Sequence, residues 1–155
     1  MKSVLVDTSF IVALLDRDER AHSRCKSALR GLSAPLISCE AVIAEACYLL
    51  RNIPGAQDAV LANVSNGSFQ IAFDLSLQSI RVRALLRQYG RVPMDLADAC
   101  LVCMAEEFET GRILTLDNDF NIYRWAGNKR FEMLLLPQIS SSTAANRVKH
   151  GRELR

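Results

Sequence analysis

The sequence predicts an α/β domain with three layers, in which helices cover both faces of a mostly parallel central sheet. Short apolar runs typical of buried strands alternate along the chain with segments whose apolar residues recur at helical spacing. The chain has 155 residues, half of them hydrophobic, so one domain can bury a substantial core. No internal repeat or linker divides it. We therefore expect one α/β/α domain over residues 1–137.

Each expected element has its own signal in the sequence. Strands are expected where apolar runs are short and bounded by polar or turn residues, at 2–6, 34–39, 69–73, 112–116 and 131–137. Helices are expected where apolar residues recur every three or four positions, at 9–16, after a turn within 16–32, and at 40–52, 56–67, 76–90 and 94–111. Ser38 is a suitable N-cap for the helix that begins at 40. Residues 117–129 are expected to form a loop with one helical turn.

The charge of the chain is unevenly distributed. The formal net charge is +2, but residues 138–155 contain four Lys or Arg and one Glu, which leaves 15 basic and 16 acidic residues in the rest. The body of the protein is therefore not a basic clamp, and a polyanion would need local neutralisation by a metal ion or a few arginines. Because residues 138–155 lack apolar periodicity, we expect a basic tail there that is either disordered or an extension that docks on a partner.

Composition also bears on the compartment. No apolar run approaches the roughly 20 residues of a membrane span. The first apolar run is broken by Asp7, which argues against a secretory signal. The five cysteines are odd in number and lie in apolar stretches, so reduced thiols in the core are expected. Cys100 and Cys103 have the spacing of a redox or zinc motif, but no second pair completes it. We expect a cytoplasmic protein without a membrane partner.

Four acidic residues stand in unusual positions. Asp7 directly follows the strand 2–6, and Asp117 directly follows the strand 112–116. Because ligands bind where the carboxyl ends of parallel strands meet, both aspartates are expected at that edge of the sheet. Glu45 and Asp98 lie on expected helices, and most of their neighbours at three and four positions are apolar. All four carboxylates are thus expected in poorly solvated settings.

Carboxylates in such settings need a partner, because an unpaired buried charge is costly or shifts its pKa until it is neutral. Few Lys or Arg lie near these segments, and none falls on the same apolar faces. A hard divalent cation, Mg²⁺ or Mn²⁺, suits oxygen ligands. Simpler explanations exist for each acid: Asp7 as a helix cap, Asp117 as a turn residue, and the two helical acids as partners of arginines. These explanations must hold four times over, which favours a metal site.

Four stretches carry a resemblance to a known family. VLVDTSFIVALLD, CEAVIAEACYLL, PMDLADACLVCMAEE and ILTLDNDF resemble, in order and spacing, the four acidic motifs of PIN-domain ribonucleases, and most of all those of VapC-type toxins. The resemblance extends from residue 2 to about residue 136. It implies a PIN-like, Rossmann-like α/β/α domain whose acidic cluster binds Mg²⁺ or Mn²⁺ and which hydrolyses RNA.

The resemblance also assigns roles to individual residues. The four family acids correspond to Asp7, Glu45, Asp98 and Asp117. Thr8 or Ser9 corresponds to the hydroxyl position that supports the first aspartate, and Asp119 is an auxiliary ligand or a support. Asp95 lies one helical turn before Asp98 and competes for its role. Asp98 is preferred because the Ala and the apolar run that the motif expects follow it.

The chemistry implied is hydrolysis of a phosphodiester bond. Metal lowers the pKa of a bound water, which attacks phosphorus in line with the leaving 3′ oxygen and leaves 5′-phosphate and 3′-hydroxyl ends. Tyr123 and Trp125, close to Asp117, either pack their loop or stack on an RNA base. VapC-like toxins form homodimers and are silenced by a small antitoxin, so the resemblance implies both partners here.

Other functions are compatible with parts of this pattern. One is a stand-alone RNA-processing nuclease of the same fold. An α/β phosphotransfer enzyme would carry its D-x-D motif after the first strand, whereas here DND follows a later strand and DTS the first. A non-catalytic interaction module would lack at least one of the four acids, and all four positions are filled.

Overall fold

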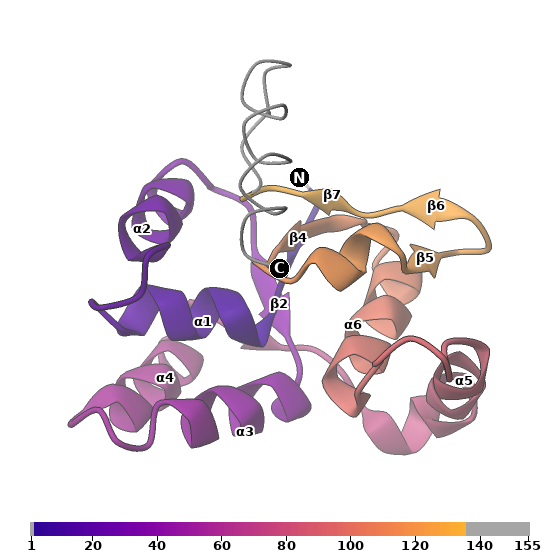
Figure 1. Cartoon of the computed structure of the whole chain (residues 1–155), viewed down its shortest axis with the longest axis horizontal. Helices are drawn as coiled ribbons and strands as arrows, with labels where there is room; N and C mark the ends of the chain where they lie inside the picture. Colours follow the sequence, from indigo (N-terminus) through magenta and orange to yellow (C-terminus); the bar gives the residue numbers. More distant parts are fainter. Residues whose placement is uncertain (1, 136–155) are drawn as a thin grey trace, which may run out of the picture.

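The computed structural model describes residues 2–135, shown in Figure 1. Residue 1 and residues 136–155 lie outside the described part of the chain, and the expected tail over 138–155 therefore does too. Within residues 2–135, no helix is both long enough and apolar enough to cross a membrane.

Strands and helices alternate as the sequence predicts. The strands are β1 (Val4–Val6), β2 (Leu36–Ser38), β3 (Gln70–Ile71), β4 (Arg112–Leu114), β5 (Arg124–Trp125), β6 (Lys129–Arg130) and β7 (Glu132–Met133). The helices are α1 (Thr8–Leu15), α2 (His22–Arg30), α3 (Glu40–Leu49), α4 (Ala56–Ser65), α5 (Leu75–Gln88), α6 (Leu96–Glu107) and the short 3₁₀ helix η1 (Asn118–Asn121).

Five strands form one parallel sheet in the order β3-β2-β1-β4-β7. The first strand is at its centre, where Leu5 pairs with Ile37 of β2 on one side and with Ile113 of β4 on the other. Figure 1 shows α1 and α2 on one side of these strands and α6 on the other. The prediction of a mostly parallel sheet between helical layers is confirmed.

The core forms around β1 and α6. All three residues of β1 are buried, as their uninterrupted apolar run predicts for a central strand. Helix α6 is buried over 97–105, because it packs between the sheet, α5 and the β5 strand. Cys100 and Cys103 are buried on this helix as free thiols, which confirms that they pack in the core.

Two local expectations are wrong, and a third is met only by a shorter element. Ser38 does not cap α3, because it still belongs to β2; its hydroxyl donates to the Val6 carbonyl at 2.8 Å, and the N-cap residue is Cys39. The expected loop 117–129 contains β5 and the start of the β5–β6 hairpin, whose turn includes Gly127 at φ +89°. The expected last strand 131–137 is represented by the two-residue β7 within the described residues.

Candidate active site

Two aspartates meet at the carboxyl edge of the sheet because their strands are neighbours. Asp7 follows β1, and Asp117 lies three residues beyond the end of β4. The register pairs Val6 with Leu114, and the Asp7 amide donates to the Leu114 carbonyl at 3.1 Å. The two carboxylates are close enough that Asp117 raises the pKa of Asp7. The expectation that both lie at one edge is confirmed.

The Asp7 carboxylate is held by three hydrogen bonds. Its Oδ1 accepts from the Thr8 amide at 2.8 Å, which makes it the N-cap of α1. Its Oδ2 accepts from the Thr115 hydroxyl at 2.7 Å and from the Ser9 hydroxyl at 3.2 Å. Asp7 is only 4 % exposed, and burial raises its pKa despite these donors. Of the two hydroxyl residues that follow Asp7, it is Ser9 whose side chain binds it.

Thr115 is a site residue that the sequence analysis missed. Its hydroxyl donates to Asp7 and also accepts the Asp117 amide at 3.0 Å. The Ser9 hydroxyl in turn accepts the Leu116 amide at 2.9 Å. These bonds fix the end of β4 against the end of β1. A Thr two positions before an acid that ends a strand is the signal that could have indicated it.

Asp117 and Asp119 lie together at the start of η1. The Asp117 Oδ1 accepts the Asp119 amide at 2.9 Å and so caps the short helix, as the turn explanation predicts. Partial burial and then the charge of Asp117 raise the pKa of Asp119. Capping does not exclude a second role, because only one oxygen of Asp117 is used in this hydrogen bond.

Asp95 and Asp98 form a capping box at the start of α6. The Asp95 Oδ1 accepts a hydrogen bond from the Asp98 amide at 2.8 Å. In return, the Asp98 Oδ2 accepts a longer hydrogen bond from the Asp95 amide at 3.4 Å. Asp95 is exposed, whereas Asp98 is only 7 % exposed. Burial, followed by the charges of Asp95 and Asp7, raises the pKa of Asp98 to about 7. This large shift marks Asp98 as a functional candidate.

Glu45 completes the group from α3. It is half-buried, and burial raises its pKa, with further contributions from Asp95 and Asp7. Asp95 therefore influences both helical acids, so it belongs to the cluster as well as capping α6. The nearby Thr8 hydroxyl lowers the pKa of Glu45, yet it is buried without a hydrogen-bond partner among residues 2–135.

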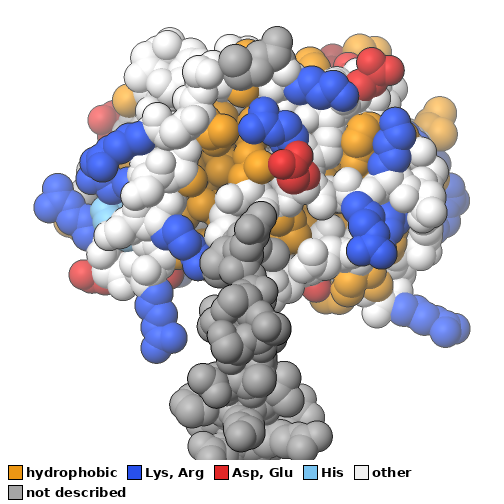
Figure 2. Space-filling view, turned by 90° about the horizontal axis from the view of Figure 1, so that it is seen from above, with side chains coloured by type: hydrophobic (Ala, Val, Ile, Leu, Met, Phe, Trp, Pro, Cys, Tyr) orange, Lys and Arg blue, Asp and Glu red, His pale blue; other side chains and the backbone are white. Residues whose placement is uncertain are grey.

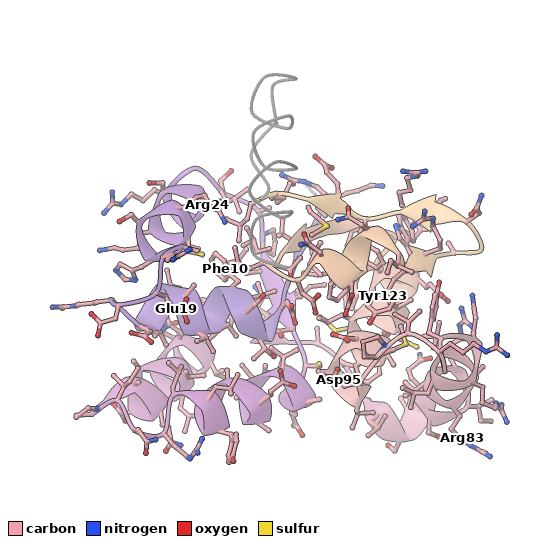
Figure 3. All side chains as sticks on the ribbon, in the orientation of Figure 1. Phe10, Glu19, Arg24, Arg83, Asp95 and Tyr123 are labelled. Carbon is pink, nitrogen blue, oxygen red and sulfur yellow. The ribbon has the colours of Figure 1, made fainter. Side chains whose placement is uncertain are left out.

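Within residues 2–135, no Lys or Arg forms an ion pair with the acidic cluster (Asp7, Glu45, Asp95, Asp98 and Asp117). No Lys or Arg is among the main causes of the raised pKa values of Asp7, Glu45 and Asp98 either, which argues against the arginine-pair explanation for the two helical acids. The one ion pair within residues 2–135 joins Arg81 to Glu106 at 2.7 Å, at the opposite end of α6 from Asp98. In Figure 3, Asp95 lies between α3 and α6, with Tyr123 above it.

The donor set fits a hard divalent cation. Its members are carboxylate and hydroxyl oxygens, and the orphaned Thr8 hydroxyl adds an unused donor or acceptor. Within residues 2–135, no three His, Cys, Asp or Glu side chains already enclose a point suitable for an ion.

Comparisons with known proteins agree with this geometry. The family model of the PIN domain matches residues 4–126, and the chain therefore belongs to the PIN domain family. It is 28% identical over 134 residues to ribonuclease VapC26 of Mycobacterium tuberculosis, which covers 84% of this chain and 99% of that protein. Its fold is similar to the crystal structure of the M. tuberculosis toxin VapC20, described as cleaving the sarcin-ricin loop, with a TM-score of 0.71. That match has 18% identity and covers 77% of this chain and 93% of the other.

Proposed function

We propose that this protein is a divalent-metal-dependent endoribonuclease and the toxin of a toxin–antitoxin pair. The observation that carries the proposal is the acidic cluster at the carboxyl edge of the sheet, whose buried members have raised pKa values and no cationic partner within residues 2–135. Membership of the PIN domain family and similarity to a VapC ribonuclease support the same activity. We place its action in the cytoplasm, where RNA is available.

Four acids would hold the ion, which we propose to be Mg²⁺ or Mn²⁺. These are Asp7, Glu45, Asp98 and Asp117, with Asp95 and Asp119 as auxiliary groups. When bound, the ion would lower the pKa of a water molecule and stabilise charge on the scissile phosphate. It would also relieve the repulsion among the carboxylates, which are expensive to bury without a counter-charge.

The protein's own residues orient the reaction. Ser9 and Thr115 fix Oδ2 of Asp7, so this carboxylate keeps one geometry while substrate enters. A bound cation would hold Asp98 in its ionised form, although burial and the charges of Asp95 and Asp7 raise the pKa of this carboxyl in the metal-free protein. Attack in line on phosphorus would leave 5′-phosphate and 3′-hydroxyl ends. RNA is itself negatively charged. The negative charge of its scissile phosphate would therefore have to be neutralised where that phosphate meets the acidic cluster.

Basic side chains are dispersed over one face of the molecule. Figure 2 shows the molecule from above Figure 1; on this face Lys and Arg side chains are scattered on both sides of a strip of apolar side chains. The basic groups are thus separated rather than gathered into one patch there.

We propose two protein partners from the similarity to VapC-type toxins: a second copy of this chain and a small antitoxin. A homodimer is supported by large exposed apolar side chains, among them Tyr48 and Leu49 of α3 and Leu61 of α4. Leu61 also lines an apolar hollow of about 580 Å³ between α3 and α4. A small antitoxin that inserts an arginine would find the acidic cluster a suitable site, because carboxylates bind guanidinium groups in a bidentate way.

Cleavage of RNA tests the proposal directly. The wild-type protein should cut single-stranded or loop RNA with Mg²⁺ or Mn²⁺ and should be silent in EDTA. Asp7→Asn and Asp98→Asn should each abolish cutting while the circular dichroism spectrum is unchanged. Asp58→Asn, an equivalent change at an exposed position on α4, should cut normally. Cutting that persists in EDTA, or in either site variant, would refute metal-dependent catalysis at this site.

The toxin assignment needs separate tests. Light scattering should show a dimer at micromolar concentration, and a small protein encoded beside the gene should bind tightly and block cleavage. An active monomer without an inhibitory neighbour would keep the nuclease and replace the toxin with a stand-alone RNA-processing enzyme.

A further inference from the structure

Tyr123 places a phenol hydroxyl against Asp98, one of the buried acids of the site. Its hydroxyl donates to Oδ2 of Asp98 at 3.1 Å, although 25 positions separate the two residues. Tyr123 lies between η1 and β5 and is 0 % exposed. It therefore makes no contact with bulk solvent, and it is not available to stack on an RNA base.

The ring is held on several sides, so the hydroxyl has a defined position. Its neighbours are Tyr89 and Phe120, each with ring centroids 5.2 Å away in an edge-to-face arrangement. The Tyr123 amide donates to the Asp119 carbonyl at 3.2 Å. Arg124 fixes the same segment, because its amide donates to the Tyr89 hydroxyl at 2.9 Å. A phenylalanine ring could make the same ring contacts at this position.

The hydroxyl therefore needs an explanation other than packing. Burying a phenol hydroxyl is unfavourable unless it finds a partner, and the partner here is a carboxylate rather than a backbone carbonyl. Both donors to Asp98, the Tyr123 hydroxyl and the Asp95 amide, reach the same oxygen, Oδ2. Within residues 2–135, no donor to Oδ1 is found. The hydroxyl thus fixes one oxygen and leaves the other without a hydrogen bond.

We propose that Tyr123 is a positioning residue of the metal site, which orients Asp98 so that its free oxygen Oδ1 faces the divalent ion. This inference rests on the proposed function, because it takes Asp98 as a metal ligand. The hydrogen bond also selects the ionised form of the carboxylate, which is the form that binds a cation. Partners of metal ligands that act in this way typically change metal affinity by roughly 10- to 100-fold when removed.

Tyr123→Phe removes the hydroxyl and keeps the ring. The dissociation constant for Mn²⁺ should rise by roughly 10-fold or more, measured by titration calorimetry or by the electron paramagnetic resonance of free Mn²⁺ without RNA. The Mn²⁺ concentration for half-maximal RNA cleavage should rise by the same factor. The cleavage rate at saturating Mn²⁺ should largely recover, because the ligands themselves are retained.

Tyr89→Phe is the matched control. It removes a neighbouring phenol hydroxyl that bonds the Arg124 amide and touches no acid of the site. It should lower the melting temperature about as much as Tyr123→Phe and leave the Mn²⁺ affinity unchanged. An unchanged affinity in Tyr123→Phe, or an equal loss in both variants, would overturn the positioning role.

The two proposals can fail separately. Wild-type protein that binds Mn²⁺, with the predicted loss in Tyr123→Phe, but cuts no RNA would refute the ribonuclease and retain the positioning role. Wild-type protein that binds no Mn²⁺ would refute both the positioning role and the metal-dependent mechanism.

Discussion

The Thr115 hydroxyl donates a 2.7 Å hydrogen bond to Oδ2 of Asp7, although 108 positions separate the two residues. Both are buried, and the bond joins the ends of two neighbouring strands, β1 and β4. Because the same hydroxyl accepts the Asp117 amide, one side chain connects two of the proposed metal ligands. Loss of the Thr115 hydroxyl should therefore change both the stability of the fold and its affinity for metal.

Thr115→Val should lower both stability and metal affinity. Hydrogen bonds to charged groups contribute about 1.5–3 kcal/mol, so the free energy of unfolding should fall by about that amount in a urea titration. Mn²⁺ affinity should fall as well. The control is Thr110→Val, since the Thr110 hydroxyl is equally buried but donates to the Ser3 carbonyl away from the acids. If both variants lose Mn²⁺ affinity equally, the Thr115 bond has no special connection to the site.

The raised pKa of Asp98 predicts that metal-free protein loses stability as pH rises. Well below pH 4 this carboxyl is neutral in both the folded and the unfolded chain, because its ordinary pKa is 3.8. Between about pH 4 and pH 7 the unfolded chain loses the proton and the folded chain keeps it, so stability falls by up to about 4 kcal/mol. In EDTA, denaturation at pH 5 and pH 8 should show the part of this fall that lies above pH 5, about 3 kcal/mol, and Asp98→Asn should show a smaller fall. Asp58→Asn should keep the full dependence; an identical slope in all three proteins would contradict the assignment.

Divalent ions should stabilise the fold by mass action. An ion present at 100 times its dissociation constant adds about 2.7 kcal/mol, which for a chain of this size raises the melting temperature by about 5–10 °C. Asp7→Asn should show a much smaller rise. Its metal-free melting temperature should not fall far and can increase, because one buried carboxylate is removed. Equal shifts with Mn²⁺ in both proteins would place the ion elsewhere.

Gly111 should not tolerate a side chain. A Cβ there would collide with the Trp125 indole and lie 3.1 Å from the Arg130 carbonyl. Gly111→Ala should lower the free energy of unfolding by about 1–3 kcal/mol and alter the fluorescence of Trp125, the only tryptophan in the sequence. Gly31→Ala, where a Cβ meets only ordinary contacts, should be close to neutral. Similar losses in both variants would show that this close approach is not limiting.

Periodicity and strand ends predicted most of this fold. The strands at Val4–Val6 and Arg112–Leu114 and the helix at Leu96–Glu107 lie within their expected ranges, because their apolar patterns are uninterrupted. The rule that ligands gather at the carboxyl ends of parallel strands correctly brought Asp7 and Asp117 together. These signals are local, so one sequence is enough to detect them.

The supporting hydrogen bonds could not be predicted in the same way. Thr115 and Tyr123 act on Asp7 and Asp98 across 108 and 25 positions, so their roles depend on tertiary packing. Ser38 shows the opposite case: its cap-like position next to a helix was overridden by a bond to the Val6 carbonyl of the adjacent strand. Whether the proposed acids bind metal depends on side-chain convergence, which spacing alone does not define.

The position of β4 in the sheet has a consequence for newly made protein. This strand is inserted between β1 and β7, so the centre of the sheet is closed by a segment that the ribosome makes late. Asp7 is synthesised among the first residues, but it acquires its Thr115 partner only after the chain beyond residue 115 has emerged. A growing chain that has not yet exposed Thr115 and Asp117 therefore has no assembled acidic cluster, and the proposed metal site cannot form before β4 is in place.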